Sequence, residues 1–553
     1  MNKCWILFLL FILSVNSYAQ VFTWGYSYSG GNSSAVSSTL SSDVTQIVAN
    51  ETAFAALKSD GSVVTWGDSS YGGDSSTVSG AIASNVVSIT ASYRAFAALK
   101  SDGSVVTWGD SSWGGNSSTV SSSISSGVSK VFSNGVSFAA LKTDGSVVTW
   151  GSSGNGGDSS VVSLSQSLGG YTPVVSIIPN IGNAYTALKA DGSFVSWGNS
   201  SFGGSTGSIN VTNVSTTTLG VIVGNSEAFA AIKNDGSVVT WGYSTSGGDS
   251  SSVSSELSSN VTKIIPSDAA FAALKSDGSV VTWGSTTYGS DSSSVASSLS
   301  SGVVEVVANG FAFAAIKSDG SVITWGNSSY GSDSSSVANS ITSGVVSVVA
   351  NEYAFAAIKT DGSVVTWGNQ YYGGDSSSLS SSLSSGVQSI VTNSTAFAAL
   401  KSDGSVVTWG DSNYGGDSSS VSSDISSGVT AIYSTLKAFA ALKSQDTTAP
   451  TVTLTDTDSD NIVSNSDVVT LTATFSESMT ATPTLSLTGI VSDAEMTATA
   501  SASIWTYTWT VSTTVTSTTA TVSGTDLSGN AYVGTDSLTF TILSKSFTKT
   551  ESG

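Results

Sequence analysis

The sequence predicts an all-β protein in which about ten repeats of 42 residues form a β-propeller, followed by a smaller β-sandwich. Two observations lead to this fold class. A Trp-Gly pair occurs ten times, most often 42 residues apart, and it ends a hairpin pattern each time. After residue 444 the Trp-Gly pairs stop, and threonine alternates with apolar residues, as it does in half-exposed strands.

The chain begins with the pattern of a secretory signal, which we assign to residues 1–19. Lys3 gives a positive start, Trp5 to Leu13 is a short apolar run, and small residues precede a cleavage site after Ala19. The alternative is a retained membrane anchor. The single cysteine, Cys4, lies in this segment, so the mature chain would carry no thiol. We expect a secreted or cell-surface protein of bacterial type, with no transmembrane segment in the mature chain.

The composition excludes several classes of partner. Only 10% of the residues are charged, the net charge is −21, and histidine is absent. Such a chain cannot neutralise phosphates, so no nucleic-acid partner is expected. It also disfavours docking on an anionic membrane and offers no imidazole to a metal ion.

Each repeat carries a hairpin, which the second copy illustrates. A β-branched run, Val86 to Ile89, is followed by an apolar segment, Ala95 to Lys100. Asp102-Gly103 then makes a tight turn, because glycine accepts the positive φ that the turn needs, and Val105 to Trp108 returns. These strands are apolar on both faces, which suits sheets stacked face to face.

The two ends of the array are complementary halves. The mature chain starts with Val21 to Gly25, a half-repeat containing Trp-Gly, and the array ends with Ala438 to Lys443, which no Trp-Gly follows. The simplest interpretation is that the first strand completes the last blade and closes a ring of ten blades. A helical or split arrangement is the alternative.

The repeat resembles that of the regulator of chromosome condensation superfamily. The resemblance rests on Ile47 to Asn50, Ala53 to Lys58, Asp60-Gly61, Val64 to Gly67 and Tyr71 to Gly73, and it extends from Val21 to about Lys443. It implies a β-propeller. The superfamily also includes secreted bacterial inhibitors of β-lactamases, which implies inhibition of an extracellular enzyme as one function. This array has ten units where the family usually has seven, and Phe54 where the family often has histidine.

A second domain is expected over residues 445–543, with residues 544–553 as a tail. Several short alternating strands in this length predict a β-sandwich. Asp446 to Pro450 at its start and Asp526 to Ala531 near its end resemble bacterial immunoglobulin-like domains of surface proteins.

The same domain contains a candidate calcium site. Asp456, Asp458 and Asp460 have the alternate spacing that places oxygens around a calcium ion, and Asp526 is a candidate fourth ligand. The alternative is a solvated acidic turn. We expect no other cofactor.

Three sets of residues recur with the repeat. Aspartates eight residues after Trp are expected to cap loops, with a cation-attracting ring as the alternative. Lysines before each Asp-Gly are expected to pair within the hairpin. Aromatic residues five positions after Trp are interpreted as packing rather than a sugar platform, and they are Tyr71, Trp113, Phe202, Tyr288, Tyr330, Tyr372 and Tyr414.

The candidate binding residues lie in the three-residue turns that precede the AFAALK-like segments. These turns differ from copy to copy on an otherwise constant scaffold, as binding surfaces do, although simple drift would give the same pattern. Several carry residue types that dominate binding energy. The candidates are Tyr93, Arg94, Glu227, Phe311, Glu352, Tyr353 and Lys437.

No catalytic constellation is visible, because no histidine is present to activate the abundant serines. We therefore expect a non-enzymatic binding or adhesion protein that presents propeller loops to an extracellular protein or glycan. The alternatives are an inhibitor of an extracellular enzyme such as a β-lactamase, and a polysaccharide-acting enzyme with an acid pair.

Overall fold

The computed structural model describes residues 19–160, 172–205, 222–444, 448–479, 482–512, 515–526 and 530–543. The chain divides into two units, Met1–Ser444 and Gln445–Gly553. Strands dominate both, and the prediction of an all-β protein is confirmed. The predicted signal up to residue 18 and the predicted tail lie outside the described residues. None of the helices in the described ranges is long and apolar enough to cross a bilayer.

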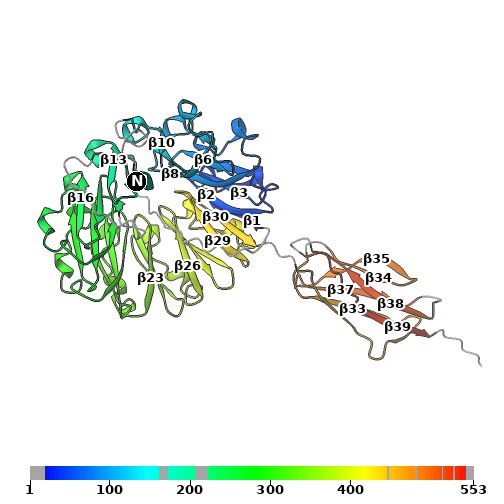
Figure 1. Ribbon diagram of the computed structural model, residues 1–553. Coiled ribbons are helices and arrows are strands. Elements are labelled where there is room, and N and C mark those ends of the chain that lie inside the picture. Colours follow the sequence, from blue (N-terminus) through cyan, green and yellow to red (C-terminus); the bar gives the residue numbers. More distant parts are fainter. Residues whose placement is uncertain are drawn as a thin grey trace, which may run out of the picture. The chain divides into compact units, whose positions relative to one another are not determined.

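The first unit contains ten three-stranded antiparallel sheets in its described part (Figure 1). The first five are β2 (Val44–Ala49), β3 (Ala53–Lys58) and β4 (Val63–Gly67); β5 (Val86–Ala91), β6 (Ala95–Lys100) and β7 (Val105–Gly109); β8 (Val128–Ser133), β9 (Ser137–Lys142) and β10 (Val147–Gly151); β11 (Val174–Pro179), β12 (Ala184–Lys189) and β13 (Phe194–Gly198); β14 (Ile222–Gly224), β15 (Ala228–Ile232) and β16 (Val238–Gly242). The other five are β17 (Val261–Pro266), β18 (Ala270–Lys275) and β19 (Val280–Gly284); β20 (Val303–Ala308), β21 (Ala312–Lys317) and β22 (Val322–Gly326); β23 (Val345–Ala350), β24 (Ala354–Lys359) and β25 (Val364–Gly368); β26 (Val387–Thr392), β27 (Ala396–Lys401) and β28 (Val406–Gly410); β29 (Val429–Ser434) and β30 (Ala438–Ser444) with β1 (Ala19–Gly25).

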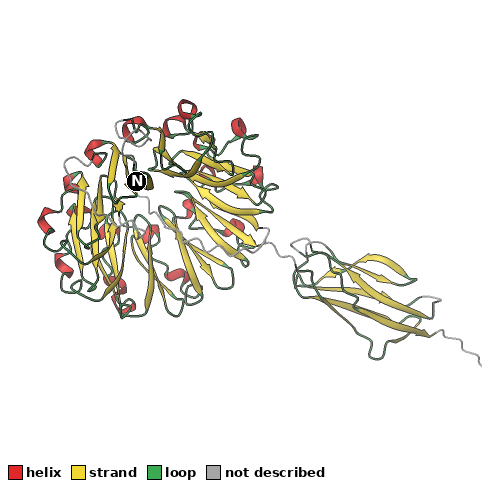
Figure 2. Ribbon diagram, viewed as in Figure 1, coloured by secondary structure: helices red, strands yellow, loops and turns green. Residues whose placement is uncertain are grey.

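Short 3₁₀ helices follow the sheets, and Figure 2 shows many of them along the outer rim of this unit. The first helix after each Trp-Gly ends on the recurrent aromatic position. In chain order they are η1 (Ser27–Ser29), η2 (Ser34–Val36), η3 (Ser69–Tyr71), η4 (Ser76–Val78), η5 (Ser111–Trp113), η6 (Ser118–Val120), η7 (Ser153–Asn155), η8 (Ser200–Phe202), η9 (Ser244–Ser246), η10 (Ser251–Val253), η11 (Thr286–Tyr288), η12 (Ser293–Val295), η13 (Ser328–Tyr330), η14 (Ser335–Ser340), η15 (Gln370–Tyr372), η16 (Ser377–Leu379), η17 (Ser412–Tyr414) and η18 (Ser419–Val421).

The predicted hairpins are confirmed. In the first sheet Phe54 pairs with Trp66 across β3 and β4. The turn between them is closed by the Asp60 Oδ1 atom, which accepts a hydrogen bond from the Ser62 N–H at 2.8 Å. Gly61 has a φ of 77°, the left-handed conformation for which glycine is suited. The turn of this hairpin is therefore determined by the residues of the turn itself, Asp60, Gly61 and Ser62.

The core of each sheet is a ring pair that also connects neighbouring sheets. The Trp66 ring stacks on Phe54 with centroids 5.0 Å apart, and Phe54 is completely buried. The Trp66 indole N–H donates to the carbonyl oxygen of Gly30, in the preceding repeat, at 3.1 Å. Equivalent bonds join Trp108, Trp150, Trp197, Trp283, Trp325, Trp367 and Trp409 to a glycine of the preceding repeat. The central strand of the sheet, β3, is buried on both faces, as predicted, whereas the outer strands are partly exposed.

The N-terminal strand belongs to the last sheet. β1 pairs antiparallel with β30, and Trp24 lies opposite Phe439, on which its ring stacks at 5.4 Å. The Trp24 indole N–H donates to the Gly415 carbonyl oxygen at 3.1 Å. The prediction that the first strand completes the last sheet is confirmed. β29 of this sheet contacts β2, so the tenth sheet also lies against the first.

The recurrent lysines have a structural role: alongside the hydrogen bonds from the turn serine, most help to lower the pKa of the aspartate in their own hairpin turn, as Lys58 does for Asp60, and most also form a hydrogen bond outside the hairpin. The Lys58 Nζ atom donates to the carbonyl oxygen of Thr39, in the preceding loop, at 3.1 Å. Seven further lysines bond the carbonyl 19 residues earlier, and they are Lys100, Lys142, Lys275, Lys317, Lys359, Lys401 and Lys443. These lysines therefore fasten each hairpin to the loop before it.

The recurrent aspartates cap loops, as expected. The Asp74 Oδ1 atom accepts a hydrogen bond from the Ser76 N–H at 2.8 Å. The same bond, to the residue two positions later, is made by Asp158, Asp249, Asp291, Asp333, Asp375 and Asp417. These carboxylates hold the backbone of their own loop.

The second unit consists of two sheets on one core. The first has the order β31-β33-β37-β36 and the second β32-β39-β38-β34-β35. A shared core includes Leu471, Trp509 and Phe540, which confirms the β-sandwich in its general form. The strands are β31 (Val452–Asp456), β32 (Ile462–Ser464), β33 (Val468–Phe475), β34 (Thr484–Leu487), β35 (Val491–Glu495), β36 (Thr497–Ala498), β37 (Ile504–Thr510), β38 (Ser517–Ser523) and β39 (Ser537–Leu543).

Candidate binding face on the three-residue turns

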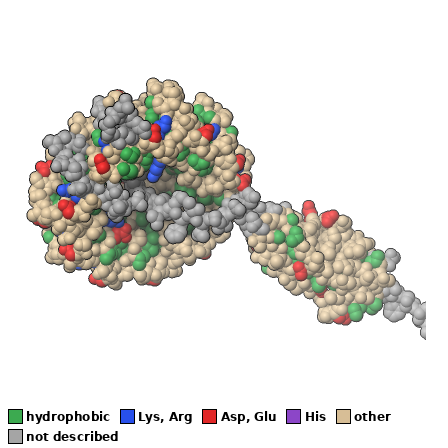
Figure 3. Space-filling model, in the orientation of Figure 1, with side chains coloured by type: hydrophobic (Ala, Val, Ile, Leu, Met, Phe, Trp, Pro, Cys, Tyr) green, Lys and Arg blue, Asp and Glu red, His purple; other side chains and the backbone are tan. Residues whose placement is uncertain are grey.

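The candidate binding face is built from the turns between the first and central strands of each sheet in the first unit. It lies at the end of the sheets opposite the Asp-Gly turns, because the strands are antiparallel. In the space-filling view, most of the visible surface of this unit is neither hydrophobic nor charged (Figure 3). Side chains that depart from this background therefore deserve a functional interpretation.

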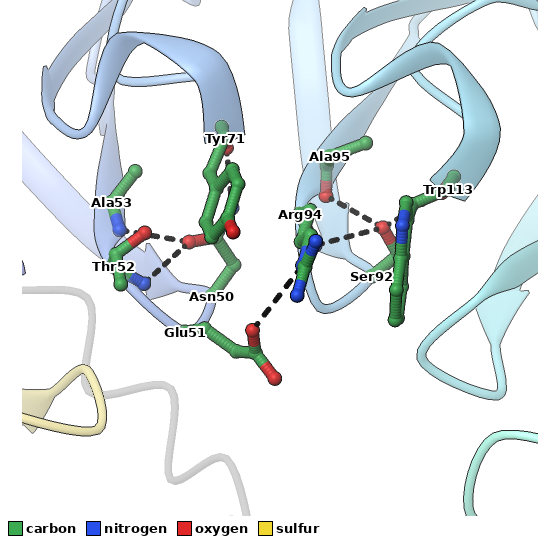
Figure 4. A network of polar contacts seen from close by, with 9 residues as sticks. All are labelled: Asn50, Glu51, Thr52, Ala53, Tyr71, Ser92, Arg94, Ala95 and Trp113. Atoms are coloured by element: carbon green, nitrogen blue, oxygen red, sulfur yellow. Dashed lines mark hydrogen bonds and ion pairs between the residues drawn. The ribbon is translucent and has the colours of Figure 1, made fainter.

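The first residue of each turn is a fixed cap. The Asn50 Oδ1 atom accepts hydrogen bonds from the N–H groups of Thr52 (3.0 Å) and Ala53 (2.8 Å), and its Nδ2 donates to the Tyr71 carbonyl oxygen at 2.6 Å (Figure 4). The last of these bonds is repeated by Asn134, Asn180, Asn225, Asn309, Asn351 and Asn393, and by the hydroxyls of Ser92, Ser267 and Thr435. This position is therefore structural, although the sequence interpretation included it in the variable turn.

The second residue links successive turns through its backbone. The Glu51 N–H donates to the carbonyl oxygen of Tyr93 at 3.2 Å, and the Tyr93 N–H donates to that of Gly135 at 2.7 Å. The Leu436 N–H donates to the Glu51 carbonyl oxygen at 3.1 Å, which joins the last turn to the first. Neighbouring turns thus form one continuous surface at these positions.

In four turns the third residue, Arg94, Phe311, Tyr353 or Lys437, places its side chain against an aromatic residue that ends a 3₁₀ helix. The Arg94 guanidinium lies between Tyr71 and Trp113, with its Cζ atom 4.7 Å and 4.5 Å from the ring centroids (Figure 4). Its Nε atom is 3.6 Å from a carboxylate oxygen of Glu51, an ion pair too long to be a hydrogen bond. Two ring faces and a nearly buried carboxylate thus hold one cation.

Three consecutive repeats form an aromatic ladder. Phe311 lies between Tyr288 and Tyr330, with centroid distances of 4.9 Å and 4.0 Å. Tyr353 lies between Tyr330 and Tyr372, at 5.3 Å and 4.6 Å. All five rings are partly exposed. They form a half-buried aromatic surface built from turn residues and helix ends together.

The other predicted residues lie in the same series of turns. The Lys437 Nζ atom is 4.9 Å from the Tyr414 ring and 5.7 Å from Tyr26. Glu227 accepts a hydrogen bond from the Ser246 hydroxyl at 2.6 Å. The Tyr93 ring lies 5.7 Å from Trp113 and crosses Gly135, where a Cβ atom would come within 2.3 Å of it. Glu352 is the second residue of the turn that carries Tyr353.

The sequence interpretation missed the partners of these residues. It assigned the aromatic set, including Tyr71, Trp113 and Tyr288, to packing, and each of these rings does pack on a turn side chain while remaining partly exposed. These contacts could have been predicted from a constant spacing in the sequence. A third turn residue stacks on the aromatic positions 23 residues before it and 19 residues after it, as Arg94 and Tyr353 do.

Burial changes the ionisation of several groups on this face. It raises the pKa of Tyr93, as do the carboxylates of Glu51 and Asp268. Burial also raises the pKa of Tyr353, to which Glu352 contributes. Burial raises the pKa of Asp268 to about 6. The tyrosines therefore remain neutral hydroxyl donors at physiological pH.

Three of the four candidate calcium ligands accept hydrogen bonds from nearby groups, whereas the Oδ2 atom of Asp458 is buried without a hydrogen-bond partner among the described residues. Asp456 and Asp460 accept hydrogen bonds from the N–H groups of Asp458 (2.8 Å) and Ile462 (3.1 Å). Asp526 is fully buried and accepts two hydrogen bonds from Asn530, at 2.8 Å and 2.9 Å. Within the described ranges, no three Asp, Glu, His or Cys side chains are grouped as a metal ion would require. Calcium binding stays a prediction.

Comparison with known proteins does not identify a function for this chain. No protein-family model matches this chain, and no curated protein is significantly similar to it in sequence. Function therefore has to be argued from the turns and the rings that flank them.

Proposed function

We propose that this chain is an extracellular binding protein whose turn face holds a protein partner, and that residues 20–444 form a closed ten-bladed propeller carrying that face. The leader-like residues 1–19 support export. The closed form is supported by the β1–β30 pairing, by the Trp24 bond to Gly415 and by the contact of β29 with β2. The second unit would be an immunoglobulin-like spacer.

The observation that carries this proposal is the aromatic ladder from Tyr288 to Tyr372. Its five partly exposed rings form a continuous row across three repeats. Tyrosine and tryptophan bury large areas at little cost in conformational entropy, which makes them frequent anchors of protein interfaces. A soluble protein gains nothing in isolation from exposing such a surface.

The stacking favours a protein over a glycan as the partner. A sugar binds an aromatic residue on a free ring face. In the ladder, Phe311, Tyr330 and Tyr353 have rings on both sides, at 4.0 to 5.3 Å, so their faces are covered. What remains exposed is ring edges and tyrosine hydroxyls, which suit the mixed apolar and polar surface of a protein.

The test compares the binding of two variants, one altered on the turn face and one altered at the opposite end of the same strands. Immobilised mature protein would be exposed to surface proteins of the producing cells, and the retained protein identified and titrated. The variant F311S/Y353S should weaken its binding at least about thirtyfold, since loss of an interface anchor costs about 2 kcal/mol or more. The matched control S318A/T360A alters exposed residues at the other end of β21 and β24 and should bind normally. Equal binding by both variants would refute the turn face as the binding site.

A further inference from the structure

The loop after each Trp-Gly pair has one position at which two repeats differ from the other eight. The seventh residue after the tryptophan is serine at Ser290 and Ser332, and it is glycine in every other repeat. Each serine comes two positions after a ring of the aromatic ladder, Tyr288 or Tyr330. In the sequence, the third turn residue is aromatic in only two repeats, 21 positions after each serine. The serines therefore accompany the ladder.

A side chain at this position does not fit the loop that the glycines form. At Gly374, a Cβ atom would lie 2.4 Å from the carbonyl carbon and oxygen of Gly368, well inside the contact distance of these atoms. A serine therefore requires the loop to move. The Ser290 Oγ atom donates a hydrogen bond to the Gly284 carbonyl oxygen at 2.9 Å, and Ser332 makes the equivalent bond. The hydroxyl thus holds the displaced loop on the carbonyl group that excludes a Cβ atom elsewhere.

The backbone of the two serine loops is displaced in three measurable ways. The residue before the 3₁₀ helix has a φ of −80° at Ser285 and −82° at Asn327, whereas it lies between −62° and −70° in the other eight loops. The serine nitrogens lie 3.2 Å and 3.3 Å from the carbonyl oxygen of that residue, and the Gly374 nitrogen 2.8 Å. The serine carbonyl oxygens accept hydrogen bonds from Thr282 and Thr324 at 2.6 Å, and that of Gly374 accepts its bond at 3.3 Å.

The ring planes of the ladder differ with the kind of loop that carries them. Tyr288 and Tyr330, on the serine loops, stack on Phe311 with interplanar angles of 19° and 24°. Tyr330 also stacks on Tyr353, at 20°. Tyr372, on a glycine loop, meets Tyr353 at 39°, which is a tilted contact. The near-parallel contacts of the ladder are therefore those made by rings on serine loops.

We propose that Ser290 and Ser332 are positioning residues of the turn face, which hold the rings of Tyr288 and Tyr330 parallel to the rings inserted beside them. This inference rests on the proposed function, and it names residues outside the ladder that prepare the ladder for its partner. Stacked rings restrict one another, so their exposed edges and hydroxyls keep fixed places. A surface that is ordered before binding loses less conformational entropy when the partner docks, which strengthens binding without any new contact.

The first test exchanges the two kinds of loop in the mature chain. S290G/S332G gives both loops the Tyr-Gly-Gly-Asp sequence that follows Trp66, and G374S gives the loop of Tyr372 the Tyr-Gly-Ser-Asp sequence. Each variant thus contains only loops that the chain already forms. In crystal structures, the angle between Tyr353 and Tyr372 should decrease from 39° towards 20° in G374S, and the stacked contacts should tilt in S290G/S332G. Unchanged ring angles in either variant would overturn the proposal.

The second test titrates these variants with the surface protein that the immobilised mature chain retains. S290G/S332G should bind it about fivefold more weakly and G374S about threefold more tightly, because order in the ring row is lost or gained before binding. G157S is the matched control, since it introduces the same clash in a loop whose helix ends on Asn155 and that contains no aromatic residue. It should bind normally. Equal affinities of all these proteins would contradict the positioning role.

Urea unfolding separates positioning from stability. A merely structural role would lower the unfolding midpoint of S290G/S332G and leave the affinity of the folded protein unchanged, whereas we expect a small change in midpoint and a clear loss of affinity. The two proposals fail separately. If F311S/Y353S loses the partner while S290G/S332G binds it normally, the binding face stands and the role of the serines does not. If F311S/Y353S binds as tightly as the unsubstituted protein, the proposed function itself fails.

Discussion

At the scale of single residues, the recurrent tryptophans combine two interactions: the ring stacks within its own sheet, and the indole N–H bonds to the preceding repeat. The ring of Trp325 stacks on Phe313 at 5.3 Å inside its own sheet, while its indole N–H reaches the Gly289 carbonyl oxygen of the preceding repeat at 3.0 Å. Both contacts are buried. The Trp-Gly pattern predicted the hairpin, but the bond between repeats was not predicted, because its acceptor is a backbone oxygen that no side-chain pattern marks.

This dual role predicts unequal effects of one substitution at two sites. W325F keeps a ring but leaves the Gly289 carbonyl oxygen without its donor, which should cost about 1–3 kcal/mol. W241F is the matched control, because the Trp241 indole nitrogen is buried without a hydrogen-bond partner in the described part of the chain. The urea midpoint should fall clearly for W325F and much less for W241F. Equal losses would mean that the hydrogen bond contributes nothing between repeats.

At the scale of elements, the capping asparagine connects a turn to the 3₁₀ helix that carries the aromatic ring. Asn351 Oδ1 accepts from the N–H groups of Tyr353 (2.9 Å) and Ala354 (2.8 Å), and its Nδ2 donates to the Tyr372 carbonyl oxygen at 2.7 Å. The cap therefore fixes Tyr353 relative to Tyr372, the last two rings of the ladder. Rigid presentation of this kind reduces the entropy that a partner has to overcome on binding.

Removing the cap should loosen the ladder. N351A leaves several buried backbone groups without partners, at about 1–3 kcal/mol each before relaxation, so both the unfolding midpoint and partner binding should decrease. N351S should retain more of both, because Ser92 and Ser267 already cap the equivalent turns with a hydroxyl. Measurement of the two variants by urea unfolding and by titration with the partner distinguishes them. An N351A variant as stable as the unsubstituted protein, and binding as well, would show that the cap is dispensable.

Contacts between residues close in the sequence could be predicted, whereas contacts between distant segments could not. Asp60-Gly61 predicted its hairpin because the turn is decided within four residues. The acceptor for Lys58 could not be predicted, because it is a carbonyl in a serine-rich loop with no pattern of its own. The variable turns indicated Arg94 as a candidate, yet its two rings come from different repeats, and only the structure shows that they enclose it.

At the scale of the whole molecule, repetition multiplies small electrostatic effects. Sixteen aspartates in the Asp-Gly turns and loops have a lowered pKa, because each accepts hydrogen bonds from the serine two positions later; they are Asp60, Asp74, Asp102, Asp144, Asp158, Asp191, Asp235, Asp249, Asp277, Asp291, Asp319, Asp333, Asp361, Asp375, Asp403 and Asp417. Each stabilises the fold above its unfolded pKa, and this stability is lost as the pH falls through its folded pKa. Because the groups are exposed, each contribution is small, and only their number makes the effect measurable.

The expected pH profile has two parts. Below about pH 4 the urea midpoint should fall steeply, as the sixteen aspartates become protonated. Between about pH 6 and pH 4 it should rise slightly, because the pKa of Asp268 is raised to about 6 and the folded state takes up this proton before the unfolded state does. D268N should remove the rise and keep the fall. A midpoint that is constant down to pH 3 would contradict the proposed role of the aspartates.

The pairing of β1 with β30 also determines when folding can finish. Residues 19–25 find their partner only after residues 438–444 have been made, more than 400 positions later in the chain. Closing so long a loop is slow compared with forming the local hairpins, so the inner sheets can assemble early while the last one waits. During synthesis, the strand of residues 19–25 therefore stays unpaired until residues 438–444 have been made. A chain truncated before β30 therefore cannot complete the last sheet.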